Sequence, residues 1–274
     1  MMNGAESLVR SLLAAGVDTC FTNPGTSEMH FVAALDRVSG MRCVLGLFEG
    51  VVTGAADGYY RMSDRPASTL LHLGPGLANG LANLHNAKKA RSGVVNVVGE
   101  HASTHLSLDA PLTSDIQAVA APMSHWVDTA ASARSVAAQG REAVRQACAR
   151  PGRIATLVLP ADSAWGEADP AAGQPGAGDE GPLALAAPQP LAPQALQEAA
   201  AALRAHGPRT LLLLGGRALR AQATQWAGRL SAATGCAVMS EFYGARIERG
   251  AGRVAVPRVP YAVEPALAAL QPYT

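Results

Sequence analysis

One acidic residue stands where a buried strand would meet a helix. Glu49 follows the apolar run MRCVLGLF and precedes GVVTGAADGY, a helix pattern whose small residues permit close packing. Burial makes a carboxyl group costly to ionise and so raises its pKa. A raised pKa allows the group to exchange protons near neutral pH. A carboxylate at this place can also simply stabilise the N-terminus of the following helix, and position alone favours that structural role.

Two glycine-containing segments follow other predicted strands. His72 opens the segment HLGPGLAN at the end of one strand, and Asn23-Pro24-Gly25 follows another. Open α/β sheets bind ligands at the carboxyl ends of their strands, and glycine lets the backbone approach a ligand closely. Together with Glu49, these segments predict one crevice edge built from three loops.

These loops require an alternating set of strands and helices to hold them. Short β-branched or apolar runs predict the strands, and amphipathic spacing predicts the helices. Alternation of this kind implies an α/β fold with a mostly parallel sheet flanked by helices. The predicted strands are 17–21, 41–47, 67–73, 93–98 and 154–159, and the predicted helices are 3–15, 27–38, 50–62, 77–90 and 131–149.

The composition changes after the last of these strands. Residues 166–193 are rich in Ala, Gly, Pro and Gln, which bury little surface, so they predict a linker after a first domain at 1–165. A second α/β pattern follows at 194–274, with helices at 194–205 and 218–233 and strands at 210–216 and near Ala237. About 80 residues are fewer than a usual domain contains, so we expect this second domain to be incomplete.

Charge and cysteine content exclude several classes of protein. Lys and Arg number 22 against 21 Asp and Glu, so the chain lacks the basic field of a sequence-independent nucleic-acid binder. The four cysteines are widely spaced, which is unlike a zinc ribbon or a disulfide scaffold. No signal-type stretch and no run of about 18 apolar residues occurs, so we expect a cytoplasmic protein with no membrane or nucleic-acid partner.

Two glycine fingerprints and one metal-like spacing do not indicate a binding site, because the surrounding sequence does not support them. Glycine fingerprints at 176–181 and 250–255 lack a flanking strand and helix, because the first lies in the predicted linker and Pro257 follows the second. His101, His105 and Asp109 have a metal-like spacing if helical, but nearby Ser, Thr and Pro residues indicate a loop, so we expect no metal there.

Three segments in order resemble the thiamine-diphosphate-dependent enzymes of the acetolactate synthase, benzoylformate decarboxylase and pyruvate decarboxylase group. They are GVDTCFTNPGTSE, FEGVVTGAADGYYRMSDRPA and HLGPGLANGLANLHNA. The resemblance covers about residues 3–165, which would form the pyrimidine-binding domain, and continues weakly through 190–274 as the start of a central domain. It implies a decarboxylase or carboligase, a lyase or transferase that uses thiamine diphosphate and a 2-keto acid.

The resemblance also assigns roles to residues near the cofactor. A Glu at the place of Glu49 hydrogen-bonds the aminopyrimidine and favours the imino tautomer that removes the thiazolium proton, so the resemblance reverses the structural preference above. The backbone of Pro24 and Gly25 would border the aminopyrimidine. Asn79 would line the loop beside it.

Two further positions align with substrate-facing residues of some decarboxylases. Thr26 stands where they carry Ser, and His72 where they carry a His that acts as acid or base. An ordinary histidine at a strand end is the alternative for His72. Thr22, at a place often held by Gly, and Glu100, where synthases carry Gln, depart from the pattern and leave the substrate open.

Family enzymes hold the diphosphate through Mg²⁺ on a further domain marked by Gly-Asp-Gly, a motif that does not occur after residue 166. By resemblance the active site forms between chains of a homodimer or tetramer, so we expect half a site here, inactive alone. Three alternatives stay open: a truncated enzyme, one subunit of a split enzyme, and a non-catalytic homologue that binds a partner or nucleotide. Whether FAD binds near 215–219 is also open.

Overall fold

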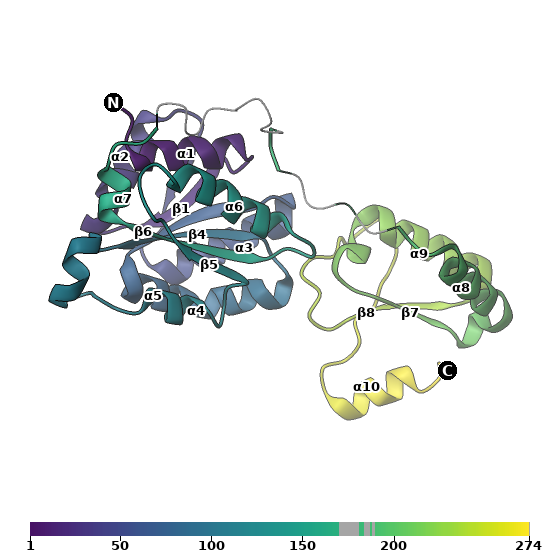
Figure 1. Ribbon diagram of the computed structural model, residues 1–274. Coiled ribbons are helices and arrows are strands. Elements are labelled where there is room, and N and C mark those ends of the chain that lie inside the picture. The colour runs from purple at the N-terminus through teal and green to yellow at the C-terminus, as the bar shows by residue number, and fades with distance from the viewer. Residues whose placement is uncertain (170–180, 184–186, 188–189, 274) are drawn as a thin grey trace. The chain divides into compact units, whose positions relative to one another are not determined.

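The computed structural model describes residues 1–169, 181–183, 187 and 190–273. The chain divides into two compact units, Met1–Ala186 and Ala187–Thr274, each with a sheet of its own (Figure 1). Much of the predicted linker and most of the fingerprint at 176–181 lie outside the described residues.

A six-stranded parallel sheet forms the centre of the first unit, in the order β2-β1-β3-β4-β6-β5. Every residue of β3, β4 and β6 is buried, because helices cover both faces of these central strands. The predicted parallel sheet flanked by helices is therefore confirmed. The strands are β1 (Thr19–Asn23), β2 (Arg42–Leu45), β3 (Ala67–Leu71), β4 (Val94–Glu100), β5 (Trp126–Thr129) and β6 (Ile154–Pro160).

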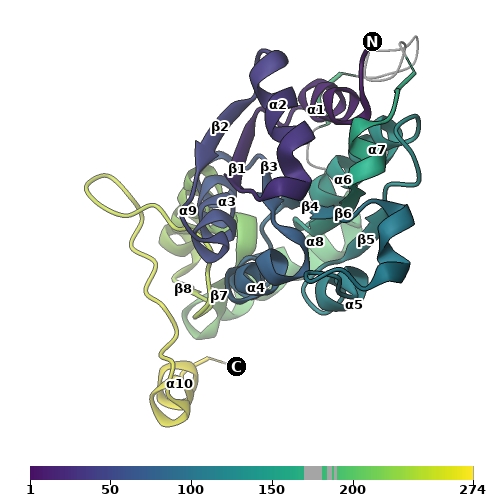
Figure 2. The same cartoon turned by 90° about the vertical axis from the view of Figure 1, so that its left-hand side faces the viewer.

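Helices cover both faces of this sheet (Figures 1 and 2), and a hydrophobic cluster lies on each face. One lies under α1, α2, α6 and α7, and the other under α3, α4 and α5. The helices are α1 (Gly4–Ala14), α2 (Met29–Arg37), α3 (Glu49–Ser63), α4 (Leu73–Ala90), α5 (Ile116–Ala120), α6 (Val136–Cys148) and α7 (Ala161–Trp165), with 3₁₀ turns η1 (Thr26–Glu28) and η2 (Ser103–Leu108).

The Gly-Pro-Gly segment differs from its prediction as a loop. Helix α4 begins at Leu73, four residues before the predicted start at 77, so Gly74, Pro75 and Gly76 form its first turn. Proline is well tolerated there because its missing N–H has no helical partner. The sharp change of direction falls on Leu73, whose φ is 49° and whose side chain is fully buried. A left-handed leucine costs about 1–2 kcal/mol, which this burial offsets.

Leu183 corrects the prediction that residues 166–193 bury little. Its side chain packs against the hydrophobic cluster under α1, and its N–H donates a hydrogen bond to the Ala15 carbonyl at 2.9 Å. This part of the predicted linker therefore belongs to the first unit.

The second unit is built on a pair of parallel strands. Leu211 pairs with Ala237 and Leu214 with Ser240, and a small cluster around Leu219 packs on the pair. The helices and strands expected between 194 and 237 are present. The elements are α8 (Pro193–His206), η3 (Gly207–Arg209), β7 (Leu211–Leu214), η4 (Gly216–Leu219), α9 (Ala221–Thr234), β8 (Ala237–Ser240) and α10 (Val263–Leu270).

Candidate functional site

Three strands of the first unit end beside one another. Asn23, the last residue of β1, pairs in register with Leu71, the last residue of β3. Leu71 in turn pairs with Val98, two residues before the end of β4. The segments that carry Gly25 and His72 therefore leave the sheet side by side. We call this region the carboxyl edge.

Glu49 presents a buried carboxylate with one fixed oxygen. It is the first residue of α3 and is 8% exposed. Asn79 Nδ2 donates a hydrogen bond to Glu49 Oε2 at 3.0 Å, and the helix N-terminus favours the negative charge. Within the described residues, Oε1 accepts no hydrogen bond. Glu49 thus stabilises its helix and also keeps one oxygen available for an N–H group of a ligand.

Asn79 lies in helix α4, as the predicted helix at 77–90 implies, and not in a loop beside the ligand as the resemblance suggests. Its amide reaches Glu49 from this helix, so in the structure Asn79 anchors the carboxylate. Asn83, four residues later, donates to the Gly50 carbonyl at 2.6 Å and ties the same helix to α3. Two amide side chains of α4 thereby fix the start of α3.

Gly76 lies between Glu49 and His72. A Cβ atom on Gly76 would stand 2.9 Å from Glu49 Oε1 and 3.2 Å from His72 Cβ. The two side chains therefore approach the same point of the α4 backbone from different strand ends. The structure brings Glu49, His72 and Asn79 together, although they are up to 30 residues apart in sequence.

The His72 ring is held at two places. His72 Nδ1 lies 2.7 Å from Glu28 Oε2, and a Cβ on Gly25 would overlap the ring. An ionised carboxylate only accepts hydrogen bonds, so Nδ1 is the donor when Glu28 is charged. The side chain is 25% exposed. The ring is thus oriented by its neighbours and accessible from one side.

Glu28 is the residue of this site that sequence reasoning missed. Its side chain is fully buried, and its Oε2 also accepts a hydrogen bond from the Gly25 N–H at 2.7 Å. The Glu28 N–H donates back to the Gly25 carbonyl at 3.3 Å. A glutamate three residues after the start of a helical turn is a capping pattern, and this spacing in GTSE is the signal that could have identified it.

The other predicted residues of the first loop lie at the same edge. Thr26 begins η1 and is exposed, so its hydroxyl is accessible. Pro24 has no N–H, and both the N–H and the carbonyl of Gly25 are bonded to Glu28, so the Pro24 carbonyl is the group that this backbone offers a ligand.

Two buried polar residues mark the departures from the family pattern. Glu100 ends β4, and its Oε1 accepts a hydrogen bond from the His101 N–H at 2.7 Å. Burial raises the pKa of Glu100, and the nearby Glu28 carboxylate adds to this rise. Thr22 is also buried, and its hydroxyl has no hydrogen-bond partner within the described residues.

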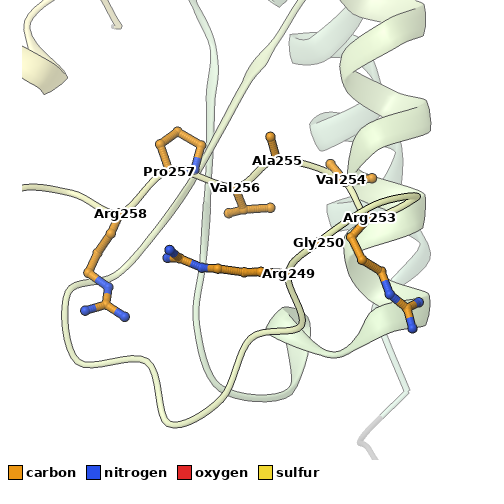
Figure 3. Close-up of a pocket in the computed structure, with 8 residues that line it drawn as sticks. All are labelled: Arg249, Gly250, Arg253, Val254, Ala255, Val256, Pro257 and Arg258. Carbon is orange, nitrogen blue, oxygen red and sulfur yellow. The ribbon is translucent and has the colours of Figure 1, made fainter.

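A separate pocket of about 740 Å³ lies in the second unit (Figure 3). Arg249, Arg253 and Arg258 contribute to its lining, and Arg253 pairs with Glu248 at 2.9 Å. The glycine segment 250–255 forms part of this pocket as irregular backbone with no following helix, as the position of Pro257 predicts. None of the predicted site residues lines it.

A search of the described residues gives two negative results. It finds no group of three or more His, Cys, Asp or Glu side chains placed to hold a metal, and this includes the segment with His101, His105 and Asp109. It also finds no helix with the length and apolar character needed to cross a membrane.

Comparison with known proteins gives consistent matches. Residues 2–123 match the family model described as thiamine pyrophosphate enzyme, N-terminal TPP binding domain. IlvX of Mycobacterium tuberculosis, which carries the provisional name acetolactate synthase large subunit, is 51% identical over 98% of this chain and 50% of its own length. Benzoylformate decarboxylase of Pseudomonas aeruginosa is 33% identical over 57% of this chain and 29% of its own length.

Residues 2–123 are an N-terminal TPP binding domain of the thiamine pyrophosphate enzyme family. The fold agrees with two solved structures, each 24% identical in sequence. A thiamine diphosphate-dependent 4-hydroxybenzoylformate decarboxylase of Rhodococcus jostii has a TM-score of 0.75 over 88% of this chain and 44% of its own. A protein of Mycobacterium smegmatis, provisionally described as thiamin diphosphate-dependent, has a TM-score of 0.79 over 100% of this chain and 51% of its own.

The chain spans about half the length, or less, of these relatives and solved structures. The family match covers α1 through α5 and thus includes every predicted site residue. The roles of Glu49, His72 and Thr26 in a reaction stay predictions at this point.

Proposed function

We propose that the first unit binds the aminopyrimidine of thiamine diphosphate and belongs to a 2-keto acid decarboxylase or carboligase of the acetolactate synthase type. The observation that supports this most directly is the state of Glu49. Its carboxylate is buried at the carboxyl edge, held through Oε2 by Asn79 and unbound at Oε1. A ring nitrogen that carries or receives a proton fits this unpaired oxygen.

Thiamine diphosphate, when bound, would supply the nucleophilic carbon and accept the electrons left by departing carbon dioxide. The residues of this chain would orient the aminopyrimidine and transfer protons to and from it. Glu49 Oε1 would hold one proton against the aminopyrimidine nitrogen, and Asn79 would keep this oxygen in place. Pro24 and Gly25 would border the ring through their backbone, since they leave the sheet next to Glu49 and His72.

The substrate would meet the chain at His72 and Thr26. His72 is partly exposed and its ring is fixed, as a group that exchanges a proton with a substrate oxygen requires. The Thr26 hydroxyl is accessible on the neighbouring turn and could bind the keto acid carboxylate.

The diphosphate and its Mg²⁺ would be held by residues outside the first unit, in a second subunit or another chain. No group of three or more His, Cys, Asp or Glu side chains among the described residues is placed to hold a metal ion. Large apolar side chains next to Glu49 are exposed in this chain, as an interface with a partner would require: Leu47 is 89% and Val51 58% exposed. We infer that a partner, such as a second copy in a homo-oligomer, covers this surface.

The test is proton exchange at the reactive carbon of thiamine diphosphate. The protein, assembled with a diphosphate-binding domain, is mixed with cofactor and Mg²⁺ in D₂O, quenched in acid and examined by proton NMR. Glu49→Gln should slow the exchange by about 100-fold or more, the usual size of an acid-base contribution. Glu142→Gln, which changes an exposed carboxylate on α6, is the matched control and should exchange at the normal rate.

The outcomes separate the alternatives. Normal exchange in Glu49→Gln would refute the role of Glu49. Cofactor binding without exchange in the unmodified protein would instead indicate a non-catalytic homologue. Exchange that appears only when a separately encoded diphosphate-binding chain is added would indicate a split enzyme.

A further inference from the structure

The Glu28 carboxylate is more deeply buried than a capping role requires. Its side chain is fully buried, and both recorded hydrogen bonds, from Gly25 N–H and His72 Nδ1, reach the same oxygen, Oε2. Oε1 is buried without a hydrogen-bond partner among the described residues. A buried polar atom left unpaired costs about 1–3 kcal/mol, so a cap on the surface would stabilise the turn at less expense.

The neighbouring strand is shaped to admit this side chain. Gly99, near the end of β4, would overlap Glu28 Oε1 if it carried a Cβ atom. Gly25 likewise leaves room for the His72 ring. Two glycines from different elements thus seat the two members of one hydrogen-bonded pair, which places the imidazole in a single orientation.

We propose that Glu28 is the positioning residue for His72, an inference that rests on the proposed function above. Its carboxylate accepts the Nδ1–H, holds the ring over Gly25 and stabilises the charged imidazolium. Nε2, which has no hydrogen-bond partner within the described residues, is then the atom that exchanges a proton with the substrate.

The proton balance of this step is simple. Nε2–H donates its proton to the keto acid oxygen as negative charge develops there, and the ring becomes neutral with Nδ1–H still bound to Glu28. Water then returns a proton to Nε2. Glu28 keeps its hydrogen bond to Nδ1–H throughout and touches neither substrate nor cofactor, in the way that the orienting carboxylate of a catalytic triad acts.

The first experiment needs no cofactor. In ¹⁵N-histidine NMR of the full chain, the neutral His72 ring should carry its proton on Nδ1, with the signal assigned through loss in His72→Gln. Glu28→Ala should shift this ring toward the Nε2–H form, while the exposed His85 and His105 serve as internal controls. An unchanged tautomer in Glu28→Ala would overturn the proposal.

A second variant displaces Glu28 without removing any charge. Gly99→Ala places a Cβ at the position of Oε1 and should shift the His72 tautomer in the same direction. Gly58→Ala is the matched control, because a Cβ on Gly58 meets no atom within 4 Å, and it should leave His72 unchanged. If Gly99→Ala folds and leaves the His72 tautomer unchanged, the proposal is wrong.

The assembled, cofactor-loaded protein gives an independent readout. Glu28→Gln and His72→Ala should each lower kcat for a 2-keto acid, by at least about tenfold, and the double variant should be no slower than His72→Ala alone, since the two residues act as one unit. Additive losses would refute the positioning role and leave the proposed function standing. If the NMR result is as expected but the assembled protein does not turn over a keto acid, the positioning of His72 by Glu28 stands and the proposed function is refuted.

Discussion

A row of buried polar side chains crosses the three central strands and should be a large contributor to the stability of the first unit. Thr69 donates to Asn96 Oδ1 at 2.8 Å, and Asn96 Nδ2 donates to Thr156 at 3.0 Å. Thr156 also bonds Ser124 at 2.7 Å. The residues of β3, β4 and β6 in this row are paired in register and have no exposed surface.

Replacing Asn96 with Ala removes the centre of this row. Two hydrogen bonds are lost at about 1 kcal/mol each, and the Thr69 hydroxyl loses its acceptor, at a further cost of about 1–3 kcal/mol. Thr156 keeps its bond to Ser124 and adds little. We therefore expect Asn96→Ala to lower the free energy of unfolding by about 3–5 kcal/mol, a large part of the ~5–15 kcal/mol typical of a domain.

The measurement is guanidinium unfolding followed by tryptophan fluorescence. Trp126 and Trp165 lie in the first unit, and Trp226 in the second is 56% exposed, so a Trp226→Phe background restricts the signal to the first unit at little cost. Asn86→Ala, on the exposed face of α4, is the matched control and should change stability by less than about 0.5 kcal/mol. Equal costs for Asn96→Ala and Asn86→Ala would refute the reasoning.

Three further predictions use other parts of the chain. Gly58→Ala should stabilise α3 by up to about 1 kcal/mol in the same unfolding assay, because the added Cβ meets open space, and destabilisation would contradict this. Burial raises the pKa of the Cys20 thiol to about 12 and that of Cys148 to about 11, whereas Cys43 is exposed. A disulfide reagent at pH 8 should therefore label Cys43 first. Cys43→Ser should remove the fast phase of the labelling reaction. Burial raises the pKa of Glu100, so ionisation of this group lowers the free energy of unfolding as the pH rises above the usual pKa of 4.5. Glu100→Gln should therefore be more stable than the parent at pH 7 and should lose this advantage in acid. An equal advantage at both pH values would contradict the raised pKa.

Most strands and helices of the first unit could be predicted from the sequence, although the accuracy of their bounds varies. Helices α1 and α3 lie within one residue of their predicted bounds, whereas α6 begins at Val136, five residues after the predicted start at 131. Strand β5 was missed because Trp126–Thr129 is four residues long, half-buried at the sheet margin, and shows no clear alternation. The start of α4 was wrong because proline fits a first helical turn as well as a loop.

The candidate site divides in the same way. Glu49 and His72 could be identified because each stands at the junction of a predicted strand and a predicted helix. The capping pattern of Glu28 could be read from GTSE, but its contact with His72 could not, because His72 is 44 residues away and the contact arises only when β1 and β3 pair. Asn79 was identified by resemblance, but its contact with Glu49 depends on the packing of α4 against α3, which no local pattern in the sequence specifies.

Three glycines carry the missing information. Gly25 admits the His72 ring, Gly76 separates Glu49 from His72, and Gly99 admits the Glu28 carboxylate. None of the three has a positive φ, so turn geometry does not account for them. At Gly25 and Gly99 the His72 and Glu28 side chains occupy the place of the missing Cβ, and at Gly76 the Glu49 carboxylate lies 2.9 Å from that place. A glycine at the carboxyl edge of a parallel sheet, where no turn requires it, therefore indicates an approaching functional side chain, and Gly99 points in this way to Glu28.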